Sequence, residues 1–339
     1  MTAQRMLTEE GIPAYVRGLG LAGANERIDV APGGDGNINW VRRVRVSGPP
    51  PRSFVLKQAR PALERFPQYS APTERLLFEA RWFELARARD DVGICPHVLA
   101  LDEPNRVLVL EDLSSAERLD AALARGADVA PQLEALARFL ARVHAATDGD
   151  ATLPARFENE AMRRLHGEHI FVLPFRANDF GLSPRLEAAA HEVRADAALV
   201  RAAAGAYARY STPRGALVHA DVQAGNVLLL ASGGVKLLDA EIAHIGDAAF
   251  DLGTLLAHLA LPAAARGGDA SALLARVSGA YRGERACGAE MIARAQGYAG
   301  FELIRRTIGA ARVPAVASDE CGLRVLELGR AWVSAAPVW

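Results

Sequence analysis

The chain has 339 residues, a length that predicts two lobes or domains with enough material to bury a core. Half of the residues are hydrophobic and 23% are charged, which is typical of a folded protein and excludes a mostly disordered chain. The formal net charge of −1, from 39 basic and 40 acidic side chains, creates no overall field for a polyanion, so we expect neither nucleic acid nor a membrane surface as a partner.

The N-terminal stretch carries acidic residues and lacks the uninterrupted apolar segment of a signal peptide. The sequence has no charge-free apolar run of about 18 residues, so we expect no membrane-spanning helix. Cys95, Cys287 and Cys321 form an odd set without CxxC spacing, which fits neither a disulfide framework nor a structural zinc site. These features predict a cytoplasmic protein.

The first third of the chain predicts a small β-rich lobe. Residues 26–59 contain segments that alternate between apolar and polar side chains, separated by Gly-rich and Pro-rich turns, which is typical of antiparallel strands. Residues 73–89 place apolar side chains at helical spacing and predict one helix. Residues 97–113 predict two further strands joined by a turn at 103–105.

The composition becomes rich in Ala, Leu and Arg after residue 113, and helical periodicity dominates. The stretch 217–241 interrupts this pattern as a pair of short strands. We therefore predict the α+β class, with a small β-rich lobe at 1–113 and a larger, mainly helical lobe at 114–339. The expected helices lie at 131–146, 183–208, 252–265, 270–282 and 288–308.

Polar side chains gather at the ends of the two predicted strands in 217–241. Asp221 and Asn226 are five positions apart, the D-x-x-x-x-N spacing of phosphotransferase catalytic loops, in which the Asp accepts a hydroxyl proton and the Asn binds a metal. Asp239 ends the second strand and can reach the same metal. Because Mg²⁺ prefers oxygen ligands, the predicted metal ligands are Asn226, Asp239 and Glu241.

The predicted N-terminal lobe supplies matching parts for a nucleotide. Lys57 lies in the middle of an apolar strand, where an ammonium needs a phosphate or a carboxylate partner. Glu79 on the following helix is the predicted partner, with Glu74 and Glu84 as alternatives on the same helix.

The turn "GGDGNIN" joins two predicted strands and can lay backbone N–H groups over phosphates. Its candidate nucleotide-binding residues are Gly34, Gly36, Asn37 and Asn39. The turn is not a Walker A loop, because no GK[ST] follows, and an ordinary hairpin connection is the alternative.

The motifs "VHADVQAGNVLL", "LLDAE" and "GDAAFDLG" together resemble those of the aminoglycoside phosphotransferase and choline kinase superfamily, which has a protein-kinase-like fold. The stretches "GDGNINWVRRV", "VLKQARP", "VLVLEDLS", "HGEHIF" and "ELIRRTIGAARV" bring the resemblance nearest to methylthioribose kinases. The usual HGD triplet reads His219-Ala220-Asp221 here, and DPE reads Asp239-Ala240-Glu241.

The resemblance implies a role for each matching residue. Asp221 would be the catalytic base, Asn226 and Asp239 would hold Mg²⁺, and Lys57 with Glu79 would orient the phosphates of ATP. His219 and Asp251 are expected to support the catalytic loop rather than to react.

Two further pairs follow from the same resemblance. Glu111 and Leu113 would bound the hinge that binds adenine through its backbone. Arg305 and Arg306 would approach the acceptor site and offset charge in the transition state, the alternative being a surface position with extended side chains.

The predicted function is therefore an ATP- and Mg²⁺-dependent kinase that phosphorylates a hydroxyl of a small metabolite, with a methylthioribose-like sugar first. Two alternatives remain open at this point: an aminoglycoside or other antibiotic phosphotransferase, and a nucleotide-binding pseudokinase without turnover. The sequence leaves both a monomer and a homodimer open.

Overall fold

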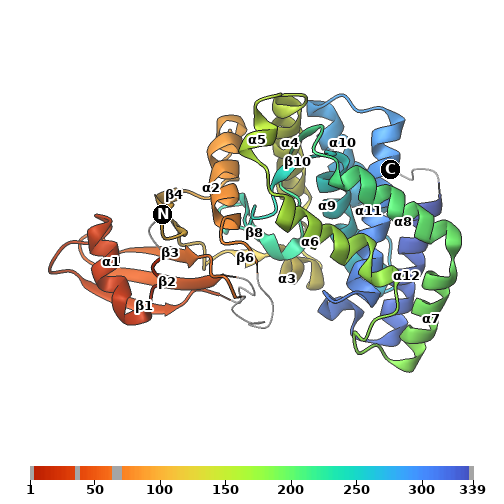
Figure 1. Cartoon of the computed structure of the whole chain (residues 1–339), viewed down its shortest axis with the longest axis horizontal. Coiled ribbons are helices and arrows are strands. Elements are labelled where there is room, and N and C mark those ends of the chain that lie inside the picture. Colours follow the sequence, from red (N-terminus) through yellow and green to blue (C-terminus); the bar gives the residue numbers. More distant parts are fainter. Residues whose placement is uncertain (1–3, 35–38, 63–70, 336–339) are drawn as a thin grey trace.

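The computed structural model describes residues 4–34, 39–62 and 71–335. Gly36 and Asn37, both predicted to contact the nucleotide, lie outside these ranges. Figure 1 shows a sheet-bearing N-terminal part at one end of an elongated molecule and a larger bundle of helices at the other. The predicted α+β organisation with a β-rich N-terminal part and a helical remainder is confirmed.

The N-terminal part is built on one antiparallel sheet of five strands in the order β1-β2-β3-β5-β4. The alternating side chains bury one face of the sheet on a core, and the opposite face is covered at β5, where Leu108 and Leu110 belong to the core of the C-terminal part. A short helix, α1 (Ile12–Gly18), joins the first of these cores and was not predicted from the sequence. The strands are β1 (Arg27–Pro32), β2 (Trp40–Ser47), β3 (Arg52–Gln58), β4 (Val98–Asp102) and β5 (Val107–Glu111).

Helix α2 (Arg75–Ala86) confirms the helix predicted at 73–89 and lies between the sheet and the helical part (Figure 1). The fully buried Trp82 and Phe83 on this helix belong to the hydrophobic core of the C-terminal part, whereas the sheet and α1 enclose a second, smaller core. Trp82 packs edge-on against Phe139 and His219. The helix that follows β3 is therefore anchored in the larger part.

The C-terminal part is a bundle in which α11 packs against α9 and α12. The helix predicted at 183–208 is two helices, because Asp196 leaves the helical conformation and its carboxylate caps the second one through the N–H groups of Ala198 and Leu199. The helices are α3 (Leu119–Ala124), α4 (Ala130–Thr147), α5 (Leu153–Arg156), α6 (Glu160–Phe171), α7 (Pro184–Ala195), α8 (Ala197–Ser211), α9 (Ala249–Ala265), α10 (Ser271–Glu284), α11 (Ala289–Ile308) and α12 (Asp319–Ser334).

Short strands interrupt the bundle and carry the polar residues noted in the sequence. The stretch 217–241, predicted as one pair of strands, instead contributes three strands to two ladders, in which β7 pairs with β10 and β8 lies between β6 and β9. A loop with one 3₁₀ turn connects β7 to β8, and β9 runs directly to Asp239. The strands are β6 (Glu117–Arg118), β7 (Ala216–Val218), β8 (Val227–Leu229), β9 (Val235–Leu237) and β10 (His244–Gly246).

The helices in the described ranges include none with both the length and the apolar character needed to span a bilayer.

Candidate active site

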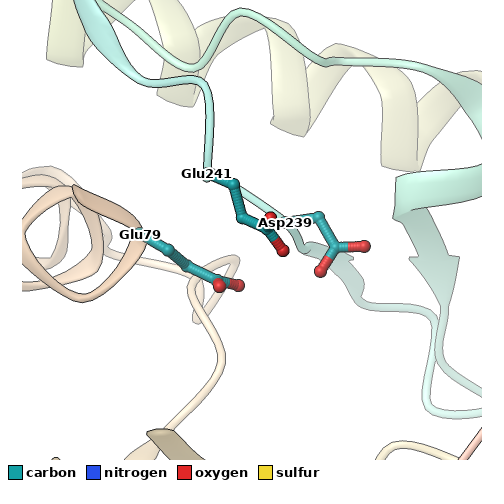
Figure 2. Close-up of side chains that lie close together, drawn as sticks. All are labelled: Glu79, Asp239 and Glu241. Atoms are coloured by element: carbon teal, nitrogen blue, oxygen red, sulfur yellow. The ribbon is translucent and has the colours of Figure 1, made fainter. Parts of the chain in front are cut away.

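The Lys57 ammonium lies at the centre of a carboxylate cluster between the two parts. Its Nζ is 2.8 Å from Glu79 Oε2, 2.6 Å from Asp239 Oδ1 and 2.5 Å from Glu241 Oε1. Of the three glutamates considered on α2, Glu79 is the one that pairs with Lys57, since Glu74 pairs with Arg106 and Glu84 with Arg156. Figure 2 shows Glu79 reaching from α2 towards Asp239 and Glu241, which follow β9.

The carboxyl groups of this cluster differ in their electrostatic environment. The pKa of Glu79 is raised to about 8, mainly because burial disfavours its charged form. The nearby carboxylates of Glu241 and Asp239 raise this pKa further, and the Lys57 ammonium offsets only part of the increase. Desolvation also acts on Asp239, but the Lys57 ammonium outweighs it and holds the pKa of Asp239 below its usual value. Three carboxyl groups thus surround one lysine, and at neutral pH Glu79 is mostly protonated while Lys57 pairs with the carboxylates of Asp239 and Glu241.

The oxygen donors here suit a hard divalent cation. Ligand atoms of Glu79, Asp239 and Glu241 all lie within 4.8 Å of one another, and carboxylate oxygens are the ligands Mg²⁺ prefers. Asn226 adjoins them, because its backbone carbonyl accepts from the N–H of Leu238, next to Asp239. Asn226 Nδ2 donates to the Asp221 carboxylate, so Oδ1 is the atom of this amide that could bind a metal.

A second buried cation, Arg75, was missed from the sequence. Its guanidinium is fully buried, lies 3.2 Å from Glu241 Oε2 and donates to Asn39 Oδ1 at 2.9 Å. Asn39 in turn donates through Nδ2 to Glu241 Oε1. The predicted nucleotide-binding residue Asn39 is therefore tied to the carboxylate cluster. Arg75 lies one helical turn before Glu79, and this i,i+4 spacing could have predicted that both side chains lie on the same face of the helix.

The rest of the predicted glycine-rich turn is only partly described. Gly34 has φ +131°, a conformation that side chains disfavour, and a Cβ on the preceding Gly33 would lie 2.7 Å from Val41 Cγ1. These two positions require glycine for backbone and packing reasons. A phosphate-binding role for Gly34 remains a prediction.

The predicted catalytic base, Asp221, is half-buried in the loop after β7. Its Oδ2 accepts from Asn226 Nδ2 at 2.8 Å and from Gln223 Nε2 at 3.0 Å. Both amides bind the same oxygen, so Oδ1 remains for an incoming hydroxyl. Desolvation raises the pKa of Asp221 to about 6, even though Arg306 and Arg305 act in the opposite direction. The carboxylate is therefore ionised at neutral pH and keeps appreciable basicity.

The predicted arginine pair lies near this base and not at the surface. Arg306 donates to Gln223 Oε1 at 2.7 Å, and Gln223 links it to Asp221. Glu302, 2% exposed, is 2.6 Å from Arg306 Nε and 3.1 Å from Arg305 Nη1. Arg305 also bonds His166 Nε2 at 2.9 Å. Gln223 and Glu302 were missed from the sequence, where a loop glutamine and a helix glutamate gave no distinguishing pattern.

Asp251, at the start of α9, holds the backbone of the loop that leads to Asp221. Its carboxylate accepts from the N–H groups of His219 and Ala220 at 2.7 and 2.8 Å, and from His144 Nε2 at 3.1 Å. His219 Nδ1 accepts from the Asp221 N–H, and burial lowers the pKa of His219 to about 4, so its ring is neutral. Both side chains therefore support the loop through its backbone. Ala220 occupies a left-handed conformation with φ +66°.

The predicted hinge follows β5 at the junction of the two parts. The Glu111 N–H donates to the His97 carbonyl and the Leu113 carbonyl accepts from Ala116, so the Glu111 carbonyl and the Leu113 N–H are the groups that would meet a base. The Glu111 carboxylate accepts from Lys236 Nζ at 2.6 Å. A role of Glu111 and Leu113 in adenine binding stays a prediction.

Comparison with known proteins bears directly on this arrangement. A family model described as "Phosphotransferase enzyme family" matches residues 30–287, which include Lys57, Asp221 and Asp239. The chain belongs to this family. This phosphotransferase is accordingly a small-molecule kinase that phosphorylates a hydroxyl group, as the sequence predicted.

Curated relatives of this phosphotransferase are methylthioribose kinases. The enzyme of Pectobacterium atrosepticum is 28% identical over 394 aligned positions, which cover 99% of this chain and 96% of that enzyme. The enzyme of Exiguobacterium sibiricum is 29% identical over 256 residues, which cover 72% of this chain and 64% of that enzyme. The resemblance stated from the motifs is confirmed.

Solved structures share the fold of this phosphotransferase. An aminoglycoside phosphotransferase from Alicyclobacillus acidocaldarius superposes with a TM-score of 0.56 at 17% identity, covering 98% of this chain and 96% of that one. Choline kinase LicA from Streptococcus pneumoniae gives 0.55 at 14% identity, covering 96% and 98%. At these identities the similarity concerns the fold alone.

Proposed function

We propose that this phosphotransferase transfers the γ-phosphoryl group of ATP, with Mg²⁺, to a hydroxyl of a small, neutral, polyhydroxylated metabolite, with a methylthioribose-like sugar as the first candidate. The methylthioribose kinases among its relatives motivate the sugar. The observation that carries the proposal is that Asn226 contacts both proposed functional segments. Its side-chain amide donates to the carboxylate of Asp221, and its backbone carbonyl accepts from the N–H of Leu238, next to Asp239.

Asp221 is the proposed general base. Gln223 and Asn226 both donate to one oxygen of the Asp221 carboxylate, which leaves the other oxygen for the acceptor hydroxyl. The side chain is thereby held in one orientation before the substrate binds, so less rotational entropy is lost on reaching the transition state. A pKa of about 6 suits a base that must be ionised at neutral pH and still accept a proton. The acceptor hydroxyl would lose its proton to this oxygen as the phosphoryl group is transferred.

Asn226, Asp239 and Glu241 are the proposed ligands of Mg²⁺, which would neutralise charge on the triphosphate when bound. Lys57 contacts the carboxylates of Glu79, Asp239 and Glu241. Phosphate oxygens would compete for the same ammonium, while Glu79 keeps it beside the proposed Mg²⁺ ligands.

The charges around the base favour a neutral acceptor. Arg305 and Arg306 contribute two positive charges, and Glu302 and Asp221 contribute two negative ones. Burial lowers the pKa of His166 well below its usual value, so its ring adds no charge. A cationic antibiotic would add unbalanced charge beside two buried guanidinium groups, whereas the hydroxyls of a sugar can use them as hydrogen-bond donors.

The test is an acceptor panel with ATP consumption as the readout, containing thiosugars, other pentoses, aminoglycosides, macrolides and choline. We expect phosphorylation of a neutral sugar that is abolished by Asp221→Asn, with nucleotide binding retained. Asp269→Asn, at the exposed start of α10, is the matched control and should retain turnover.

Equal turnover in Asp221→Asn and the parent protein would contradict the assignment of the base. Transfer to an aminoglycoside or macrolide in preference to every sugar would replace the proposed acceptor by an antibiotic. Nucleotide binding without transfer to any member of the panel would favour a pseudokinase.

A further inference from the structure

Lysine use in this chain is unusually selective. Of the 39 basic side chains only two are lysines, Lys57 and Lys236, and the rest are arginines. Both lysines are buried, with 5% of each residue exposed. Arginine occurs both at the surface and at interior positions such as Arg75, whereas both lysines are interior. Lys57 is explained by the carboxylate cluster, whereas nothing in the mechanism above uses Lys236.

Lys236 links the strand that leads to Asp239 with the predicted hinge. It lies in the middle of β9, and its Nζ donates to Glu111 Oε1 at 2.6 Å and to the Cys95 carbonyl at 3.3 Å. The same Glu111 oxygen accepts from the His97 N–H at 2.9 Å. Two donors therefore hold the carboxylate of the residue that opens the hinge.

The geometry explains why this position holds a lysine. The ammonium fits between a carboxylate and a backbone carbonyl in a site that is almost closed to solvent. A guanidinium is larger, is planar and spreads its donors in a fixed fork, so it needs more room to satisfy the same two acceptors. A hydrogen bond to an ionised group in such a site is shorter and stronger than one between neutral groups.

Loss of the ammonium would release the hinge carboxylate. Glu111 would keep the N–H of His97 as a donor but would lose its charged partner, and its side chain is only 27% exposed, so water would replace the ammonium incompletely. The hinge backbone from Glu111 to Leu113 follows that side chain directly and carries the groups that would meet a purine.

We propose that Lys236 is a positioning residue for the nucleotide base: by holding Glu111 it fixes the hinge that receives adenine, while Lys57 serves the phosphates. The two lysines thus divide recognition of one ligand between its two ends. This inference rests on the proposed function only in taking the hinge as the base-binding segment.

The test measures the two ends of the nucleotide separately by titration calorimetry, with adenosine as the probe for the base and Mg²⁺-tripolyphosphate as the probe for the phosphates. Lys236→Met should weaken adenosine binding about tenfold, the loss expected for one charge-assisted hydrogen bond, and leave tripolyphosphate binding within twofold of the parent protein. Lys57→Met is the matched control, with the opposite pattern.

Glu111→Gln is a second variant that keeps a neutral acceptor for Lys236, and it should weaken adenosine binding in the same direction by a smaller factor. The double variant Lys236→Met/Glu111→Gln should bind adenosine within twofold of Lys236→Met alone, because the two side chains act as a pair. A general loss of structure would weaken both probes equally and would be seen in thermal unfolding.

Unchanged adenosine binding in both Lys236→Met and Glu111→Gln, with tripolyphosphate binding lost in Lys57→Met, would overturn this inference and leave the proposed kinase function standing. Equal weakening of both probes in Glu111→Gln would also overturn it, since the pair would then be structural. Failure of the parent protein to bind either probe would reject the proposed function itself.

Discussion

Glu302 on α11 offers the most direct test of the buried charge network beside Asp221. The change Glu302→Gln keeps the size of the side chain and removes its charge. In the parent protein this carboxylate is 2% exposed, lies 2.6 Å from Arg306 and 3.1 Å from Arg305, and accepts from His258 at 3.1 Å. The variant therefore leaves two buried guanidinium groups without an ionised partner.

The expected loss is large because desolvated charges depend on their partners. Removing one member of a buried ion pair typically costs about 3–5 kcal/mol. Arg305 retains His166 and Arg306 retains Gln223, both neutral acceptors, so we expect a value towards the lower end of that range, about 3 kcal/mol in the free energy of unfolding. Urea denaturation followed by tryptophan fluorescence would measure it.

Glu320→Gln on α12 is a matched control. Glu320 pairs with Arg324 at the same i,i+4 spacing as Glu302 with Arg306, but its side chain is 68% exposed. Water and salt screen such a pair, so this variant should change the free energy of unfolding by less than about 0.5 kcal/mol. Similar losses in both variants, or a loss below about 1 kcal/mol in Glu302→Gln, would refute the assignment of the network to the interior.

The dependence of this loss on pH has a definite sign. The arginines hold the pKa of Glu302 well below its usual value, against the effect of burial. A depressed pKa in the folded protein contributes stability above the unfolded value of about 4.3, and that contribution disappears as the pH falls towards the folded value. The difference between parent and variant should therefore be constant from pH 6 to 8 and shrink below about pH 4.

Two further predictions follow from the site and the packing. The rate of phosphoryl transfer should rise with pH through an apparent pKa of about 6 as Asp221 ionises, and a profile that is flat between pH 5 and 7 would count against Asp221 as the base. Gly300→Ala should destabilise the protein by about 2 kcal/mol or more, because its Cβ would lie 2.6 Å from the Gly329 carbonyl where α11 meets α12. Gly297→Ala is the control on the same helix, because a Cβ there would meet no other atom within 4 Å. Thermal unfolding should show that this variant is more stable than the parent protein by up to about 1 kcal/mol. Equal effects of the two substitutions would exclude close packing of α11 on α12 as the cause.

Local sequence patterns were sufficient to predict which of the proposed catalytic and metal-binding residues lie near one another. Asp221 and Asn226 could be placed together from their five-residue spacing, and Asp239 from its position after the next predicted strand. Glu79 was distinguishable from Glu74 and Glu84 only through resemblance, since all three lie on one helix and a choice between faces needs the partner strand.

The groups that were missed act across large sequence separations. Gln223 joins Asp221 to Arg306, and Arg306 is 83 positions from Gln223 in the sequence. A glutamine in a loop also has no periodic pattern around it that would mark it as a contact residue. Lys236 could have been noticed as one of two lysines, but its partner Glu111 is 125 positions away. The break at Asp196 was readable as a helix cap in principle, although continuous apolar periodicity on both sides favoured one helix.

The anchoring of α2 in the larger core has a consequence for the position of Glu79. Displacing this helix, and with it Glu79, would expose Trp82, which is fully buried against Phe139 and His219. Exposing about 200 Å² of aromatic surface costs about 5 kcal/mol, enough to keep the displaced state below about one molecule in a thousand. The packing of Trp82 therefore fixes Glu79 on the side of the larger core, and a movement of the sheet relative to α2 would separate Lys57 on β3 from Glu79.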